Sequence, residues 1–412
     1  MNDTNLELAF TSFNLKNLAL KNRFIKTATY EGFCRDGAPT PELTDFHVSF
    51  AKGDVAMITT AYGAVNEDGL THENQMTIDE KALPYLQDLA NDVHQAGAAI
   101  SLQLTHCGFF TRSTRYKSKK PLAPSKVLNK YGLLRGRGFS RAMTERDLLQ
   151  TRRDFVRASV LVKQAGFDAI ELHLGHGYLL SQFLSPAVNK RRDQYGGTLE
   201  NRLRFPLEVL SDIISALGND FPVLCKMNLS DDFKGGVTID EAIIIAQELE
   251  KAGAAALILS GGYTSRTPFY LMRGDVPLWS MVKAESNFLQ KLVMAIFGRA
   301  IIGKYEFDEN FFLPLAGKVR ERVMLPLVYV GGVVSSKGIA AIMNEGFDLV
   351  AIGRALIHDP DFIKKVKSDS EHISPCNHCN ICVAEMEKSG VRCVIDHNRF
   401  RKCTSNESTF RS

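Results

Sequence analysis

Short apolar runs alternate with longer amphipathic stretches along most of the chain. The apolar runs are five to seven residues long, which is typical of strands buried on both faces. They span Arg23–Thr29, Val55–Ala61, Ala99–Thr105, Asp168–His173, Pro222–Met227, Ala255–Ser260, Pro326–Gly331 and Leu349–Gly353. The amphipathic stretches predict helices over Glu42–Ala51, Glu80–Ala96, Glu145–Ala165, Leu199–Ala216, Ile239–Ala252, Ser336–Asn344 and Asp361–Lys367.

This alternation predicts parallel strands joined by helical crossovers. Eight strand-then-helix repeats indicate an α/β fold of the (β/α)8 TIM barrel type. A doubly wound open sheet is the alternative, but it should have a glycine-rich phosphate turn after its first strand. The corresponding residues, Lys26 to Tyr30, contain no glycine. We therefore favour the barrel.

One long segment interrupts the alternation. The 55 residues from Pro268 to Arg322 separate the sixth and seventh predicted strands and are rich in Phe, Leu and Met. Part of this segment must be the sixth helix, and we interpret the rest as an insertion after strand 6 that forms a lid or a wall of the substrate pocket rather than an oligomer contact. The expected organisation is a barrel domain over residues 1–369 and a Cys-rich C-terminal extension over residues 370–412.

The strongest chemical signal follows the fourth predicted strand. That strand ends at His173, and His176 and Tyr178 follow directly. In a TIM barrel, the loops after the C-terminal ends of the strands carry the active site. His173, His176 and Tyr178 are therefore the predicted catalytic residues.

The residues around this histidine pair resemble a known family. His173-x-x-His176-Gly-Tyr178-Leu is followed by Phe-Leu-Ser-Pro, Asp-x-Tyr-Gly-Gly and Glu-Asn-Arg, in that order. This series resembles the Old Yellow Enzyme family of FMN-dependent ene-reductases. The resemblance implies hydride transfer from NADH or NADPH, through flavin N5, to the C=C bond of an enone, enal or dienoyl compound. His173 and His176 would hold the carbonyl oxygen of the substrate, and Tyr178 would donate the proton.

The same resemblance implies a set of FMN-binding residues. These are Thr27, Ala28, Thr29 and Ala61 beside the flavin ring, Gln103 and Lys226 at its polar edge, and Gly331, Gly332, Gly353 and Arg354 at its phosphate. Family members usually have arginine where this chain has Lys226. Lysine keeps the positive charge but lacks the planar fork that makes bidentate contacts.

Four cysteines lie close together near the C-terminus. Cys376, Cys379, Cys382 and Cys393 have the spacing C-x2-C-x2-C-x10-C, which suits thiolate ligation of a metal. The segment resembles that of 2,4-dienoyl-CoA reductase and trimethylamine dehydrogenase, which carry a [4Fe-4S] cluster beside FMN. A [4Fe-4S] cluster, a zinc ion and free thiols all remain open. A cluster would allow an external donor such as a ferredoxin to supply electrons, and a dienoyl thioester would then be a candidate substrate.

Charge is unevenly distributed along the chain. The net charge is +4, yet ten Lys or Arg and no Asp or Glu lie between Arg112 and Arg141, so the remainder totals 4 − 10 = −6. The stretch lacks the features of a nucleic-acid-binding module, so we expect no nucleic-acid partner. It is either a solvated loop or a contact for CoA or nicotinamide phosphates, with Lys117, Lys119 and Lys120 as the test residues.

Composition restricts location and class. The chain has 412 residues, of which 45% are hydrophobic, but no apolar run of 18 residues and no signal-peptide pattern. We therefore expect a cytoplasmic enzyme that has no membrane partner. A homo-oligomer is open, because the sequence does not fix the oligomeric state. Two other classes are also consistent with the residues: a flavin-free aldolase with Lys226 as Schiff base, and a metal-binding redox sensor on a barrel scaffold.

Overall fold

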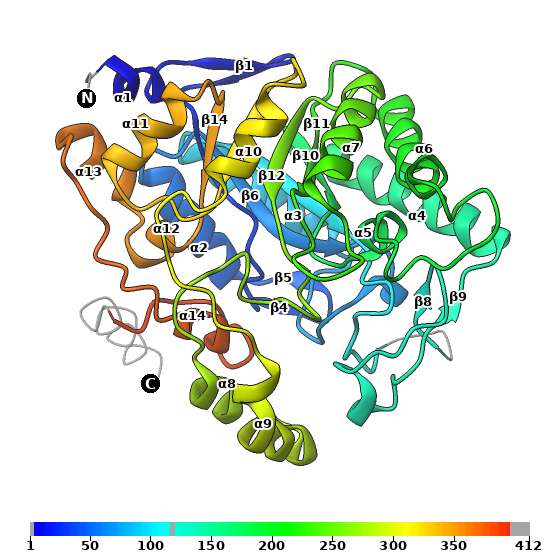
Figure 1. Ribbon diagram of the computed structural model, residues 1–412. Helices are drawn as coiled ribbons and strands as arrows, with labels where there is room; N and C mark the ends of the chain where they lie inside the picture. The colour runs from blue at the N-terminus through cyan, green and yellow to red at the C-terminus, as the bar shows by residue number, and fades with distance from the viewer. Residues whose placement is uncertain (1–3, 116–119, 396–412) are drawn as a thin grey trace, which may run out of the picture.

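A closed barrel of eight parallel strands forms the centre of the molecule. The computed structural model describes residues 4–115 and 120–395. Around the barrel, neighbouring strands follow chain order, and the last pairs with the first (Figure 1). The strands are β3 (Phe24–Lys26), β6 (Met57–Ala64), β7 (Ala99–Thr105), β10 (Ala169–Leu174), β11 (Val223–Asn228), β12 (Ala256–Ser260), β13 (Leu327–Val330) and β14 (Leu349–Ile352). The predicted TIM barrel is confirmed.

Helices surround the barrel close to the seven predicted ranges, and one more lies inside the segment from Pro268 to Arg322. They are α2 (Pro41–Lys52), α3 (Leu83–Gln95), α4 (Glu145–Gln164), α6 (Leu199–Leu217), α7 (Ile239–Lys251), α10 (Leu313–Arg320), α11 (Ser336–Asn344) and α13 (Phe362–Ser368). Several begin where a hydroxyl caps the first turn, as Thr144 does by accepting a hydrogen bond from the Asp147 N–H. Helix α3 begins three residues later than predicted, because Pro84 occupies its first turn.

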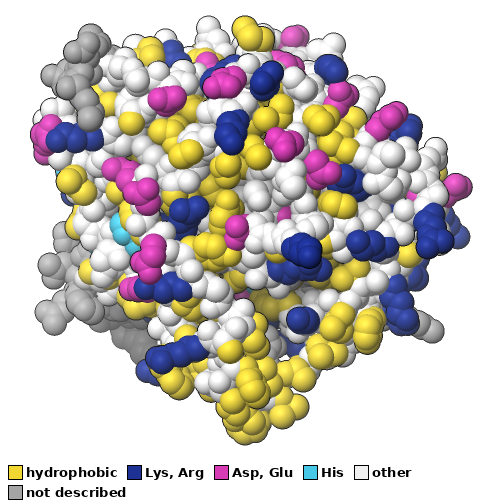
Figure 2. Space-filling model, viewed as in Figure 1, with side chains coloured by type: hydrophobic (Ala, Val, Ile, Leu, Met, Phe, Trp, Pro, Cys, Tyr) yellow, Lys and Arg dark blue, Asp and Glu magenta, His cyan; other side chains and the backbone are white. Residues whose placement is uncertain are grey.

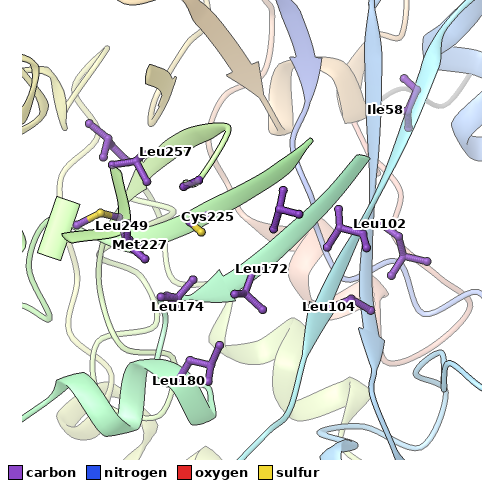
Figure 3. Packing of buried hydrophobic residues seen from close by; sticks show 14 of the residues in the cluster. Ile58, Leu102, Leu104, Leu172, Leu174, Leu180, Cys225, Met227, Leu249 and Leu257 are labelled. Carbon is purple, nitrogen blue, oxygen red and sulfur yellow. The ribbon is translucent and has the colours of Figure 1, made fainter. Parts of the chain in front are cut away.

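Each barrel strand separates two apolar layers. In β10, Ala169 belongs to the barrel interior, whereas Leu172 and Leu174 pack in the layer between strands and helices. Figure 3 shows this outer layer, where Leu172 and Leu174 lie with Leu102 and Leu104 of β7. Because alternate side chains of a strand point to opposite faces, the alternation also sends Glu171 and His173 into the barrel.

Smaller elements close the N-terminal end of the barrel and decorate its loops. Leu15 and Leu20, from the hairpin β1 (Phe13–Leu15) and β2 (Leu18–Leu20), are buried in the same cluster as the barrel interior. The remaining elements are α1 (Thr4–Ala9), β4 (Cys34–Arg35), β5 (Ala38–Pro39), η1 (Glu67–Gly69), β8 (Leu122–Ala123), η2 (Leu133–Arg135), β9 (Arg141–Ala142), α5 (Leu179–Leu184), α8 (Leu278–Ala284), α9 (Phe288–Ile301), α12 (Arg354–His358) and α14 (Ile381–Glu385).

The insertion after β12 contains more helix than predicted. Helix α10 is the sixth barrel helix, and α8 and α9 form a hairpin that extends away from the barrel beside α14 (Figure 1). The C-terminal extension is tied to the barrel loops, since Ser374 N–H donates to Val334 O (2.8 Å) and Val391 N–H to Glu31 O (2.7 Å). None of the described helices is long and apolar enough to cross a membrane.

Candidate active site

The loop after β10 brings the three predicted catalytic rings together. The rings of His173 and His176 meet edge to face with centroids 4.9 Å apart, and His173 lies 4.7 Å from the ring of Tyr178. Tyr178 in turn lies 5.2 Å from Tyr62 of β6. One side chain from the end of β10 and two from the loop that follows it therefore form a single cluster at the C-terminal end of the barrel.

Neighbouring strands hold this loop in place. His176 has a left-handed backbone (φ 58°), and its N–H donates to Asn228 Oδ1 of β11 (3.0 Å). Its ring Nε2 lies 2.8 Å from Ser260 Oγ at the end of β12. At Gly177 (φ 82°), a Cβ atom would lie 2.4 Å from the ring of Tyr263, so only glycine fits. The tight packing fixes the positions of both histidines.

Burial keeps both histidines neutral. Burial lowers the pKa of His173 well below its usual value, and lowers the pKa of His176 to about 3. The Nδ1 atom of His173 accepts a hydrogen bond from the Gly175 N–H (3.3 Å), so we assign its proton to Nε2. A neutral His173 thus presents a hydrogen-bond donor rather than a charge.

Tyr178 lies in an apolar pocket made by several loops. It shares a buried cluster with Ala61, Tyr62 and Phe110, against which Ala28 packs. Burial raises the pKa of the Tyr178 hydroxyl above its usual value, so the hydroxyl keeps its proton at neutral pH. The structure therefore places two of the residues predicted beside the flavin, Ala28 and Ala61, in the same cluster as the predicted proton donor.

A buried polar row crosses the barrel interior beside this cluster. Gln103 of β7 donates to Glu171 Oε1, and Lys226 Nζ of β11 lies 2.7 Å from the same oxygen. Lys226 also donates to Thr27 Oγ1 (3.2 Å). Gln103 and Lys226 are thus linked through Glu171, and Thr27 joins them through Lys226. The sequence analysis missed Glu171. Its position two residues before His173, on the same face of the strand, was the available signal.

A second buried ion pair lies near Thr29 and Ala61. Lys26 Nζ donates to Thr29 Oγ1 (2.9 Å) and lies 3.5 Å from Glu31 Oε1. The same Glu31 oxygen accepts the Ala61 N–H (3.1 Å). Burial raises the pKa of Glu31 to about 7, although Lys26 opposes the shift. The side chain of Thr29 and the N–H of Ala61, both predicted to lie beside the flavin, are therefore already hydrogen-bonded within the protein.

The predicted phosphate-binding residues lie at the ends of β13 and β14, which are adjacent strands. Arg354 is half-buried, and its Nη1 donates to Arg273 O (2.8 Å) and Asn380 Oδ1 (2.7 Å). The guanidinium of Arg273 lies 4.5 Å above the ring of Phe311. Its Nε is buried and has no acceptor among the described residues. Arg273 comes from the insertion, and no sequence pattern identified it.

Gly331 and Gly332 leave β13 with positive φ angles of 143° and 78°. A Cβ atom at Gly331 would lie 2.8 Å from Phe312, and one at Gly332 would lie 2.8 Å from Phe311. At Gly353 a Cβ atom would lie 3.3 Å from the side chain of Thr27. These glycines keep the chain close to the barrel end, beside the two arginines.

The four C-terminal cysteines line one small cavity of about 20 Å³. Arg354 and His358 also line it, and His358 Nδ1 lies 3.1 Å from Cys393 Sγ. None of the four forms a disulfide, and burial raises the pKa of the Cys382 thiol to about 12. Within the described ranges, no three His, Cys, Asp or Glu side chains are placed to hold a metal ion. The structure thus gathers Cys376, Cys379, Cys382 and Cys393 around one cavity, but it shows neither a zinc site nor an iron-sulfur site among the described residues.

Comparison with known proteins identifies the family. The profile of the NADH:flavin oxidoreductase / NADH oxidase family matches residues 8–263. The chain belongs to this family. The match covers more than half of the sequence, including β10 and the histidine loop. The chain is therefore an oxidoreductase, and its resemblance to the Old Yellow Enzyme family is confirmed.

Relatives of this oxidoreductase are named for different activities. It is 38% identical over 387 residues to the 4,4'-dithiodibutanoate disulfide reductase of Rhodococcus erythropolis, covering 94% of each chain. It is 30% identical over 395 residues to the NADH oxidase of Thermoanaerobacter brockii, covering 94% of this chain and 55% of that protein. The chain thus spans nearly the whole of the first relative and about half of the second.

Solved structures share the fold of this oxidoreductase. A 2-naphthoyl-CoA reductase complex has a TM-score of 0.78 at 24% identity, covering 91% of this chain and 54% of that one. The Old Yellow Enzyme homologue of Zymomonas mobilis has a TM-score of 0.68 at 20% identity, covering 90% of this chain and 99% of that one. At these identities the likeness shows the fold alone.

The residues present suit FMN, the flavin that the family indicates. The donors of Gln103 and Lys226 suit the polar edge of the ring, and the unsatisfied Nε of Arg273 suits an anion such as the flavin phosphate. Ala28 and Ala61 present small side chains toward the cluster around Tyr178. Lys226 is already paired with Glu171, so its charge is balanced within the protein.

Proposed function

We propose that this protein is an ene-reductase that reduces the C=C bond of an α,β-unsaturated carbonyl compound. The observation that supports this most is the cluster of His173, His176 and Tyr178, whose rings lie within 4.9 Å of His173 at the barrel end. Bound FMN would supply the hydride, taken from NADH or NADPH and delivered to the β-carbon. The protein's own side chains would bind the carbonyl oxygen and protonate the α-carbon.

The two histidines would act on the carbonyl oxygen. A neutral His173 can donate from Nε2, because its Nδ1 accepts the Gly175 N–H. His176 is held by Asn228 and Ser260, so its ring needs little reorganisation on binding. If Nε2 of His176 accepts from the Ser260 hydroxyl, its Nδ1 would be the second donor. The two donors would stabilise the negative charge that develops on the oxygen as hydride reaches the β-carbon.

Tyr178 would complete the reaction by protonating the α-carbon. Its raised pKa leaves the hydroxyl protonated at neutral pH, so it is ready to act as general acid. The surrounding rings, including Tyr62 and Phe110, keep bulk water away from the hydroxyl. The tyrosine would then recover its proton from solvent between turnovers.

Separate half-reactions test this proposal. In anaerobic stopped-flow experiments, Tyr178→Phe should leave reduction by NADPH unchanged and slow reoxidation by 2-cyclohexenone about a hundredfold or more. Tyr85→Phe is the matched control, because Tyr85 is 52% exposed on α3. A wild-type protein that binds FMN but is not reoxidised by any enone would overturn the proposal.

Disulfide reduction is a second candidate, favoured by the similarity to the Rhodococcus reductase over nearly the whole of both chains. Hydride would attack one sulfur, break the S–S bond and release the other sulfur as a thiolate. No carbon is protonated in this reaction, so Tyr178→Phe should barely change it. Reoxidation by 4,4'-dithiodibutanoate but not by 2-cyclohexenone would favour this candidate.

We further infer that the four C-terminal cysteines hold a [4Fe-4S] cluster. Their spacing and their position around one cavity, next to Arg354, support it. A cluster there would let a ferredoxin-like donor replace NADPH, and would make a dienoyl thioester a suitable substrate. Anaerobic iron and sulfide assays should give about four of each per chain. Cys393→Ser should lower both, whereas Cys225→Ser, at a buried cysteine on β11, should not.

A further inference from the structure

Helix α9 turns its most apolar face outward. Six large side chains on this face are each at least 46% exposed: Phe288, Leu289, Leu292, Ile296, Phe297 and Ile301. They recur at helical spacing, so they form one continuous stripe. The opposite side packs on α8, where Gly298 is buried against Leu278. Figure 2 shows the resulting hydrophobic patch at the lower end of the molecule.

The patch continues onto the segment around η2. Asn287, which caps α9, donates to Leu134 O (3.5 Å), and Arg135 Nη2 lies 2.9 Å from Glu285 Oε1. Leu133 and Leu134 are 47% and 38% exposed, and Trp279 of α8 is 58% exposed. We call the stripe on α9 together with Leu133, Leu134 and Trp279 the apolar face.

The apolar face is larger than an ordinary surface patch. If about half of each of its nine side chains is exposed, its area is roughly 900 Å². The largest patch on a typical monomer is about 300–600 Å². A hydrophobic surface of this size needs an occupant, which could be lipid or protein.

The charges on α8, on α9 and on the neighbouring basic stretch are mostly positive. Residues 278–303 carry Lys283, Lys291 and Arg299, and their single acidic residue, Glu285, is buried between Arg112 and Arg135. The neighbouring basic stretch adds the exposed residues Lys126 and Lys130. At the base of the hairpin, Asp275 and Glu306 both lie within 4.0 Å of Lys304.

Exposed apolar side chains surrounded by positive charges favour binding to an anionic surface over binding to a second copy of the chain. A two-fold dimer through the apolar face would bring Lys283, Lys291 and Arg299 of both chains together. The acidic groups at the base of the hairpin, Asp275 and Glu306, both already lie beside Lys304. An anionic bilayer instead takes up apolar and aromatic side chains at its boundary while its phosphates attract lysine and arginine. No described helix can cross a membrane, so α8 and α9 would lie in the interface.

We propose that the apolar face binds an anionic lipid membrane, in contrast to the expectation from the sequence of no membrane partner. The hairpin leaves the barrel after β12, whose last residue, Ser260, contacts His176. The membrane would therefore adjoin the end of the barrel where the candidate active site lies. This proposal does not depend on the reaction that the site catalyses.

Vesicle flotation with the full chain tests this proposal. Wild-type protein should float with vesicles of phosphatidylcholine and phosphatidylglycerol, less with pure phosphatidylcholine, and less again at high salt. The double variant Phe288→Gln/Ile296→Gln should lower the partition coefficient by roughly tenfold or more. The double variant Leu149→Gln/Ile244→Gln is the control, because both residues are exposed on other helices, at 47% and 46%.

Sedimentation of the same proteins without lipid, with circular dichroism to confirm folding, completes the test. We expect the hairpin variant to remain folded and to keep the sedimentation coefficient of the wild type. Absence of flotation with anionic vesicles would overturn the proposal. A wild-type dimer that the hairpin variant converts to monomer, again without flotation, would assign the apolar face to a second copy instead.

Discussion

The carboxylate of Glu171 lies 2.7 Å from the ammonium group of Lys226, and both side chains are almost fully buried. Breaking such a pair leaves one charge in the barrel without a partner. Glu171→Gln should therefore lower the free energy of unfolding by about 3 kcal/mol, measured by denaturant titration. Glu248→Gln removes the exposed pair with Lys251 and should change it by less than about 1 kcal/mol. If the two variants lost equal free energies of unfolding, burial of the Glu171–Lys226 pair would not explain its effect on stability.

Gly177 supports the histidine loop through its backbone conformation and its contact with Tyr263. In Gly177→Ala, the new Cβ would need both a positive φ and the space now filled by the tyrosine ring. We expect a loss of several kcal/mol in unfolding free energy and a large loss of activity, because His176 and Tyr178 would move. Gly166 has a similar φ of 88°, but a Cβ atom there would have nothing within 4 Å. Gly166→Ala should therefore lower the free energy of unfolding by only about 1 kcal/mol.

His176 should make the folded protein sensitive to acid. Its pKa falls from 6.5 to about 3 on burial, so the unfolded chain binds its proton first as pH decreases. The contribution of neutral His176 to the free energy of unfolding is therefore complete above pH 6.5 and decreases as the pH falls toward 3. For this one group the decrease is at most about 1.4 kcal/mol per pH unit. Unfolding titrations between about pH 4 and about pH 7 should show a shallower dependence for His176→Asn than for the wild type. An unchanged slope would contradict the prediction.

Arg273 should bind the flavin phosphate together with Arg354. Its Nε lacks an acceptor among the described residues, and its backbone carbonyl oxygen accepts a hydrogen bond from Arg354 Nη1. Arg273→Gln should weaken FMN binding by about tenfold or more, measured by fluorescence during flavin titration. Lys304→Gln removes an exposed cation of the same insertion and should leave FMN binding unchanged. Equal affinities for all three proteins would exclude Arg273 from the phosphate site.

The barrel was predictable because local pattern and tertiary environment agree. The runs that became β7 and β10 are apolar over a strand's length and are flanked by helix caps and glycines, so the sequence located them to within about one residue. Boundaries changed where a single residue intervened, as Pro84 did at the start of α3. The hairpin of α8 and α9 was not predicted. Its apolar residues do recur at helical spacing, but they face solvent instead of a core, so the segment was interpreted only as an insertion.

The sequence by itself determined the fold class, the family and the types of residue at the site. His173, His176 and Tyr178 lie within six positions, so one strand end necessarily brings them to the same end of the barrel. Only the tertiary structure decided which distant groups join them. Glu171 became the partner of Gln103 and Lys226, and Arg273 reached Arg354 across 81 positions of sequence. Such pairs depend on barrel closure and loop packing, which bring together residues that no local pattern connects.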